Sequence, residues 1–190
     1  MKILAEQGNL LLVWARGHLR HALGSAPAVR PNATWCETLG ATFVTLRWAD
    51  TGDLQGCMGS LEARRPLADD VAYNAVAAGA DLRGRPLITG DVDALDIELS
   101  ILSPLEPLHV VSEEEALRVI RPGEDGVVLQ MGRRRATFLP SVWPRLPTQS
   151  VFLAALKAKA GIPADRWSKD TQLWRYRVDK HVDLAPRRAA

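Results

Sequence analysis

The sequence predicts an α+β fold in which a mainly antiparallel sheet is flanked by helices. Segments with the two-residue alternation of strands are interleaved with segments whose apolar residues recur at helical spacing. Several strand segments are followed at once by a turn and another strand segment, which is the pattern of a β-hairpin. Because hairpins pair antiparallel strands, the interleaving does not indicate a doubly wound parallel sheet.

Four segments have the character of helices. In the first, apolar residues from Leu4 to Ala22 recur at helical spacing, and Gly24 follows. The second begins at Pro66 and has Asp69 and Asp70 at the positive end of its dipole. The third opens with a capping box, and the fourth ends at a glycine. The predicted helices are residues 4–22, 66–78, 112–120 and 149–160.

The predicted strands are rich in β-branched and aromatic residues or alternate between apolar and polar residues. The turn Asp50–Asp53 joins two of them into a hairpin, and Gly132-Arg133 joins two more. The predicted strands are residues 41–48, 54–59, 95–101, 127–131, 135–139 and 172–179.

The length of 190 residues suits one compact domain, or two small parts that share a core. The N-terminus lacks the pattern of a secretory signal, and no apolar run approaches the ~20 residues that span a bilayer. We therefore expect a cytoplasmic protein without a membrane segment, whose Cys36 and Cys57 are free thiols.

The sequence contains no motif for a metal or a cofactor. The four histidines lack metal-ligand spacing, and the two cysteines are far apart in sequence. A P-loop, a dinucleotide-binding glycine motif and a nucleophile elbow are absent as well. We therefore expect no metal site and assign no cofactor.

The segment Leu54–Gly59 is unusual for a strand because two glycines lie on either side of Cys57 and Met58. Glycine weakens a strand and commonly marks the close approach of a ligand or of another backbone. Gly56 and Gly59 would leave the thiol accessible and nearby N–H groups uncovered for an anion. We therefore place the functional site at this hexapeptide, which also contains Gln55. The alternative is a cysteine that serves as a small buried apolar residue.

A reactive thiolate also needs a cation or a base nearby. Arg83 and Arg85, in the loop after the second helix, are the candidate cations. Glu98, on the polar side of an apolar strand, is a candidate acid or base, or alternatively faces solvent. Asn74 lies among small residues of the second helix, where an amide usually has a specific partner.

The run Arg133–Arg135 is the clearest basic cluster. With a formal net charge of only +2, the composition does not favour nucleic acid as a partner. A solvated hairpin is the preferred interpretation of this run, and a phosphate contact is the alternative.

Taken together, these residues resemble the AMMECR family of bacteria and archaea. Leu54–Gly59 corresponds to the family motif Leu-Arg-Gly-Cys-Ile-Gly, and further matching motifs follow in the same order along nearly the whole chain. The other matching segments are residues 10–11, 43–46, 74–75, 81–83, 97–104, 126–129, 138–140 and 159–161.

The resemblance implies a single α+β domain over residues 1–190, with a larger and a smaller part and the hexapeptide in a cleft between them. We place the smaller part at residues 105–147. The resemblance also implies two partners in bacteria, a Memo-like protein and a radical S-adenosylmethionine enzyme. It does not give a settled biochemical activity.

The chain departs from the family pattern at several positions. Gln55 replaces an arginine, which removes a cation beside Cys57. Leu82 and Gly84 replace a proline and a phenylalanine, and Lys157 lies near a position where many members have a second cysteine. Arg83 is retained and is therefore the better candidate cation.

Three functions remain open from the sequence. The first choice is a component that binds a ligand or a partner, through Gln55, Gly56, Met58, Gly59 and Asn74. The second is an enzyme with Cys57 as nucleophile, Arg83 as charge stabiliser and Glu98 as acid or base. The third, a nucleic-acid-binding or regulatory protein, rests on the arginine run and a pI near 8.7.

Overall fold

The computed structural model describes residues 3–186 and divides them into two compact units. Within the described residues, the larger unit comprises residues 3–102 and 179–186, and the smaller unit comprises residues 103–178. Both combine helices with antiparallel strands, which confirms the predicted fold class.

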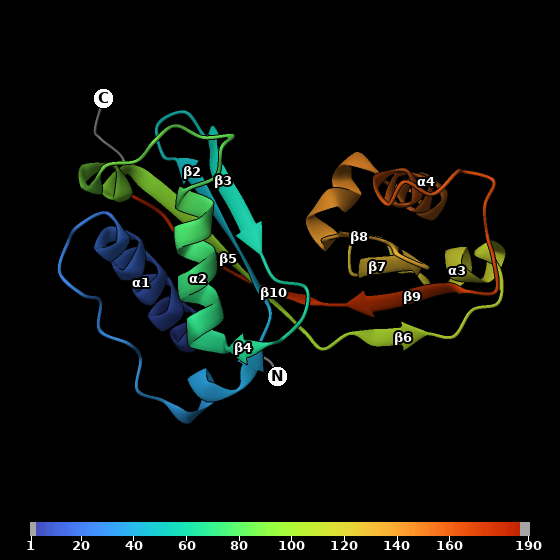
Figure 1. The fold of residues 1–190 in the computed structure, drawn as a ribbon, viewed down its shortest axis with the longest axis horizontal. Helices are drawn as coiled ribbons and strands as arrows, with labels where there is room; N and C mark the ends of the chain where they lie inside the picture. Colours follow the sequence, from blue (N-terminus) through green and yellow to red (C-terminus); the bar gives the residue numbers. More distant parts are fainter. Residues whose placement is uncertain (1–2, 187–190) are drawn as a thin grey trace. The chain divides into compact units, whose positions relative to one another are not determined.

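In its described residues, the larger unit contains two α-helices and six strands. Both helices can be followed in Figure 1. The helices are α1 (Ala5–Ala22) and α2 (Leu67–Gly79). The strands are β1 (Leu39–Gly40), β2 (Thr42–Trp48), β3 (Leu54–Gly59), β4 (Arg65–Pro66), β5 (Leu95–Leu102) and β10 (Val178–Asp183). Two 3-10 helices, η1 (Thr34–Glu37) and η2 (Thr89–Ala94), lie in its connections.

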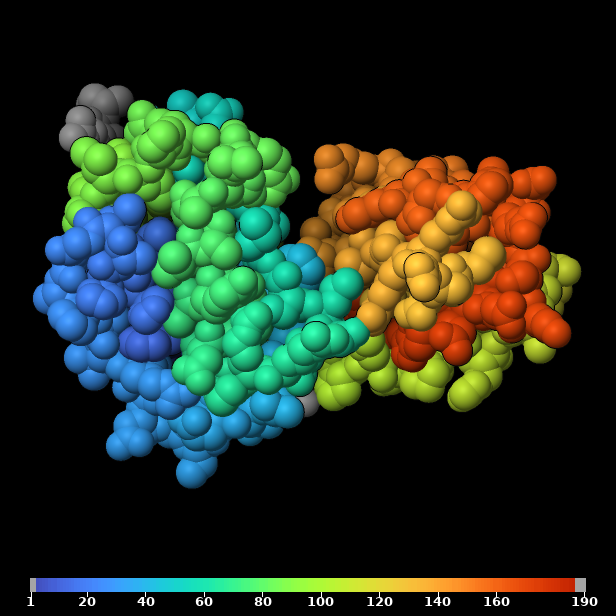
Figure 2. All heavy atoms as spheres, viewed as in Figure 1, coloured from blue at the N-terminus to red at the C-terminus, as the bar shows by residue number. Residues whose placement is uncertain are grey.

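The sheet of the larger unit has the strand order β10-β5-β2-β3, and β1 pairs separately with β4. α1 and α2 lie together against one face of this sheet, and Figure 2 shows their blue and green atoms in contact. Alternate residues of β2 and β5, such as Val44, Leu46 and Ile97, are fully buried beneath the helices. The sheet therefore has one face covered by helices and a second face that carries Thr45 and Glu98.

The smaller unit has a second sheet, with the order β6-β9-β7-β8. Its strands are β6 (Glu106–Leu108), β7 (Gly126–Met131), β8 (Arg134–Phe138) and β9 (Thr171–Tyr176). Its helices are α3 (Glu113–Val119), η3 (Pro140–Arg145) and α4 (Gln149–Lys159). Trp143 stacks on Phe152 in its core, with ring centroids 3.9 Å apart.

The smaller unit extends beyond the residues 105–147 that the sequence analysis gave it. Helix α4 packs against β8, and β9 pairs with both β6 and β7, so residues 148–178 belong to the same core. Lys157 of α4 is buried, and its ammonium pairs with Glu113 at 2.8 Å. The last predicted strand is interrupted after Tyr176. The chain leaves the second sheet there and continues as β10 in the first sheet.

Candidate functional site

The hexapeptide Leu54–Gly59 forms β3, which is an edge strand of the larger unit's sheet. In the register of the sheet, Thr45 of β2 lies opposite Cys57 on one side and opposite Glu98 of β5 on the other. Directly opposite residues of antiparallel strands point to the same face. Cys57, Thr45 and Glu98 therefore form one row across the face that α1 and α2 leave uncovered.

Lys180 of β10 completes this row, since its ammonium lies 2.6 Å from a carboxylate oxygen of Glu98. We call these four residues, Cys57, Thr45, Glu98 and Lys180, the Cys57 row. Cys57 is partly exposed, and the hydroxyl of Thr45 donates a hydrogen bond to its Sγ at 3.2 Å. The row brings a thiol, a hydroxyl, a carboxylate and an ammonium onto one strip of the sheet.

The outward backbone groups of Cys57 are bound by two side chains from the loop after α2. Asp81 Oδ2 accepts a hydrogen bond from the N–H of Cys57 at 3.0 Å, and Arg83 Nη2 donates one to the C=O of Cys57 at 3.1 Å. Arg83 Nη2 also lies 2.5 Å from Asp81 Oδ2. The two side chains thus occupy the positions that a further strand would take, which covers the sheet edge at this residue.

The electrostatics of this Asp81–Arg83 clamp follow from the same contacts. Hydrogen bonds from Arg83 and from the N–H of Cys57 hold the pKa of the Asp81 carboxyl well below its usual range. The hydrogen bond to Asp81 in turn raises the pKa of the Arg83 guanidinium. Arg83 is therefore a cation near Cys57, as expected, but a carboxylate already neutralises much of its charge.

The two glycines nearest the clamp are required by packing. A Cβ on Gly56 would overlap the carbonyl oxygen of Ala78 at the end of α2 and would lie 2.6 Å from Cβ of Asp81. A Cβ on Gly84 would overlap the carbonyl oxygen of Gln55. Gly56 thus permits the close approach of the helix end and loop to β3.

Gln55 occupies a bulge in the pairing of β2 with β3, and its side chain is fully buried. Its Oε1 accepts a hydrogen bond from Trp48 Nε1 at 3.1 Å, and its Nε2 donates to the carbonyl of Arg85 at 2.8 Å. The guanidinium of Arg85 stacks over Trp48 at 3.9 Å. The residue that replaces the arginine of the motif therefore ties the loop to the sheet and does not face the thiol.

Asn74 lies in the core, away from the Cys57 row. Its Nδ2 is within hydrogen-bond distance of Asp70 Oδ2 (3.0 Å), of the carbonyl oxygen of Thr42 (3.1 Å) and of Ser60 Oγ (3.3 Å). Asp70 also accepts hydrogen bonds from the N–H and hydroxyl of Thr42. The amide thus has the specific partners that the sequence predicted, and they are groups of the protein itself.

The structure brings together some of the predicted site residues and separates others. Cys57 and Arg83 are in contact, whereas Glu98 lies two strands away, which corresponds to roughly 9.5 Å across a sheet. Met58 is 41% exposed, and Gly59 lies against the ring of Phe43. The sequence places Asp81 in a loop and in the family-like segment 81–83, but its contact with Cys57 is not visible from sequence spacing.

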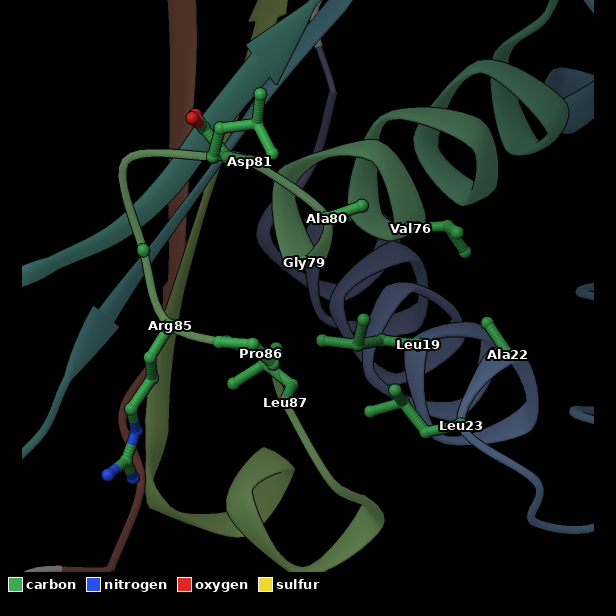
Figure 3. Close-up of a pocket in the computed structure, with 12 residues that line it drawn as sticks. Leu19, Ala22, Leu23, Val76, Gly79, Ala80, Asp81, Arg85, Pro86 and Leu87 are labelled. Carbon is green, nitrogen blue, oxygen red and sulfur yellow. The ribbon is translucent and has the colours of Figure 1, made fainter.

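Two cavities border the loop that carries the clamp. An apolar cavity of about 450 Å³ lies between the ends of α1 and α2, where Leu19, Leu23, Val76 and Leu87 face one another (Figure 3). A more polar hollow of about 340 Å³ is lined by Trp48, Gln55 and the two loop arginines. Neither cavity is lined by Cys57.

Among residues 3–186, no group of three or more histidine, cysteine or acidic side chains is arranged to hold a metal ion. In the same residues, no helix has the length and apolar character needed to cross a membrane.

Comparisons with known proteins place the chain among relatives of unassigned activity. The AMMECR1 family model matches residues 12–181. A protein of Methanothermobacter thermautotrophicus is 36% identical over 139 residues, covering 72% of this chain and 71% of the relative. Protein MJ0810 of Methanocaldococcus jannaschii is 29% identical over 98% of this chain and 96% of its own length.

A solved structure shows the same fold. The crystal structure of the uncharacterized protein PH0010 from Pyrococcus horikoshii matches with a TM-score of 0.85 and 28% identity, covering 98% of this chain and 96% of that one. The family model and the relatives agree with the motif at Leu54–Gly59 on the same family. The chain belongs to the AMMECR1 family.

Proposed function

We propose that this protein is a binding component, and that its recognition surface is the Cys57 row. The observation that carries this proposal is the set of hydrogen bonds made by the Arg83 guanidinium. Its guanidinium donates to Asp81 and to the backbone of Cys57, so it holds the edge strand in place and is not directed at the thiol.

The contacts of the thiol itself also favour binding over catalysis. The Sγ of Cys57 receives a hydrogen bond from the Thr45 hydroxyl, and a hydroxyl is not a base that removes a thiol proton at neutral pH. The carboxylate of Glu98 is held by Lys180, two strands from Cys57. The row instead presents hydrogen-bonding groups of both charges on a rigid sheet, which suits a polar partner surface.

The partners that we propose are those that the family resemblance implies, a Memo-like protein and a radical S-adenosylmethionine enzyme. The test mixes the purified protein with each of them and measures association by light scattering and calorimetry. We expect a dissociation constant of about 1 µM or tighter, which corresponds to roughly −8 kcal/mol. Absence of association with both at this concentration would contradict the partner assignment.

Matched substitutions locate the surface. Thr45→Arg puts a long charged side chain in the middle of the Cys57 row and should weaken association by at least about tenfold. Val13→Arg adds the same side chain on α1, where Val13 is 70% exposed, and should leave association unchanged. Equal effects of the two substitutions would exclude the row as the recognition surface.

An enzyme that uses Cys57 is the second candidate, supported by the partial exposure of the thiol. Its test is the rate of iodoacetamide alkylation of Cys57 at pH 7, compared with that of N-acetylcysteine. The binding proposal predicts a rate no faster than that of the free thiol, because among residues 3–186 the only recorded side-chain hydrogen-bond partner of the sulfur is the Thr45 hydroxyl, which is not a base. A rate about tenfold faster or more would favour the enzyme.

A further inference from the structure

The smaller unit has a surface hollow of about 580 Å³ at the tip of the β7–β8 hairpin, and three arginines line it. Arg133 and Arg134 come from the hairpin, and Arg166 comes from the connection between α4 and β9. Ser168 and Asp170 complete the polar part of the lining. The hollow belongs to the smaller unit, whereas the Cys57 row belongs to the larger unit.

Local structure explains why these arginines meet. Gly132 has a φ of +59° and begins the two-residue turn that closes the pair Met131–Arg134. Met131 is also the register partner of Thr171, the first residue of β9. The segment that leads into β9 must therefore pass beside the hairpin tip.

Backbone turns fix the second wall of the hollow. The N–H of Arg166 donates to the carbonyl of Pro163, and the N–H of Asp170 donates to Ser168 Oγ at 3.3 Å. The N–H of Thr171 donates to the carbonyl of Ser168 at 3.0 Å. The three arginines are thus attached to two well-defined turns.

The charges of these arginines are not compensated in the way that those of the larger unit are. In the described part of the larger unit, the side chain of each of the eight arginines forms a hydrogen bond. Among residues 3–186, the structure records no ion pair or side-chain hydrogen bond for Arg133, Arg134 or Arg166. Three arginines without a recorded side-chain partner therefore line one hollow.

The overall charge distribution supports an anionic ligand. Residues 103–178 contain 12 of the 24 lysines and arginines but only 8 of the 22 aspartates and glutamates, a net charge of +4. The remaining residues contain 12 basic and 14 acidic residues, a net charge of −2. Such a field raises the local concentration of anions at the smaller unit.

We infer that this hollow binds a small phosphate ester that also carries hydroxyl groups. Guanidinium groups match phosphate oxygens in geometry, and three of them around one hollow suit a dianionic terminal phosphate. The carboxylate of Asp170 cannot bind the phosphate, but it can accept a hydrogen bond from a hydroxyl of the same ligand. Arg133 and Arg134 thus have a role beyond that of a solvated hairpin.

Calorimetric titration at low ionic strength with ribose 5-phosphate, inorganic pyrophosphate and a thymidine oligonucleotide tests this inference. We expect ribose 5-phosphate to bind with a dissociation constant of about 1 mM or tighter. Arg133→Gln, Arg134→Gln and Arg166→Gln should each weaken it by about tenfold or more. Arg145→Gln is the matched control, because Arg145 also lacks a recorded side-chain partner but lies outside the hollow.

The position of binding is read from nuclear magnetic resonance shifts, which should be largest at the Gly132 amide. Asp170→Asn should weaken ribose 5-phosphate relative to pyrophosphate, because only the sugar phosphate has a hydroxyl for this carboxylate. The inference would be overturned if Arg145→Gln weakened ribose 5-phosphate binding as much as the three hollow variants do. It would also be overturned by no binding at about 10 mM, or by preferential binding of the oligonucleotide. An equal effect of Asp170→Asn on both small ligands would overturn the hydroxyl contact.

Discussion

The carboxylate of Asp81 accepts a hydrogen bond from the backbone N–H of Cys57 at 3.0 Å, although the two residues lie 24 positions apart in the sequence. This contact joins the loop after α2 to the edge strand that contains the family motif. With Arg83 on the carbonyl of the same cysteine, both outward backbone groups of Cys57 have partners. The motif is therefore held at its backbone, and the Cys57 side chain is left on the sheet face.

Asp81→Asn tests the clamp through the pH dependence of stability. Because the pKa of Asp81 is lowered on folding, its contribution is fully present above the unfolded value of about 3.9 and is lost as pH falls. We expect the substitution to cost about 1–2 kcal/mol at pH 7, measured by urea denaturation.

The difference in unfolding free energy between the two proteins should shrink when the pH is lowered from about 5 to 2. Asp53→Asn is the control, because it removes the same charge from an exposed residue of the turn between β2 and β3. A difference that stays constant down to pH 2 would contradict the assignment of the lowered pKa to Asp81.

Gly56→Ala should destabilise the protein by about 1–3 kcal/mol. The added methyl group would overlap backbone atoms of Ala78, and the end of a helix cannot yield as a flexible side chain does. Gly90→Ala is the matched control, because a Cβ there meets nothing within 4 Å. Similar midpoints of urea denaturation for both variants would show that packing does not require Gly56.

Asn74→Ala should lower the unfolding free energy by about 2–3 kcal/mol, because it leaves the buried Asp70 carboxylate and the carbonyl of Thr42 without their amide donor. Asn32→Ala removes the same side chain from an exposed position and should change stability by less than about 0.5 kcal/mol. If Asn74 instead contacted a ligand, its replacement would weaken binding while leaving thermal stability of the free protein unchanged.

Tyr176 should make stability fall at high pH. Burial raises the pKa of its phenol to about 12, and its hydroxyl contacts Thr137 and the carbonyl of Phe138. Since the folded pKa lies above the unfolded value of about 10, the contribution is full below pH 10 and is lost as pH rises toward 12. Tyr176→Phe should remove this pH dependence. The measurement is the free energy of unfolding from denaturant titrations between pH 9 and 11.5. If the unfolding free energy of the variant fell with pH as steeply as that of the original protein, another group would be the cause of the loss of stability.

The sequence by itself determined the type of most elements of the fold. The periodicity of residues 4–22 predicts α1, and the alternation in residues 95–101 predicts β5, because each pattern reflects burial on one side of a single element. The turn glycine of Gly132-Arg133 likewise specifies the β7–β8 hairpin from local geometry alone.

Local pattern could not determine how distant elements pair. The sequence predicts one strand over residues 172–179, but Tyr176 ends β9 in one sheet and Val178 begins β10 in the other. Only the partners of a strand decide where it changes sheet. For the same reason, the sequence placed residues 148–178 outside the smaller part.

The candidate site divides in the same way. The sequence predicts a site at Leu54–Gly59, because glycine weakens a strand and two glycines beside a thiol require a reason. Tertiary structure alone decided that Gly56 accommodates a helix end, that Gln55 faces inward and that Asp81 and Arg83 bind the backbone of Cys57. These roles depend on contacts across many residues of sequence, and no spacing within one element encodes them.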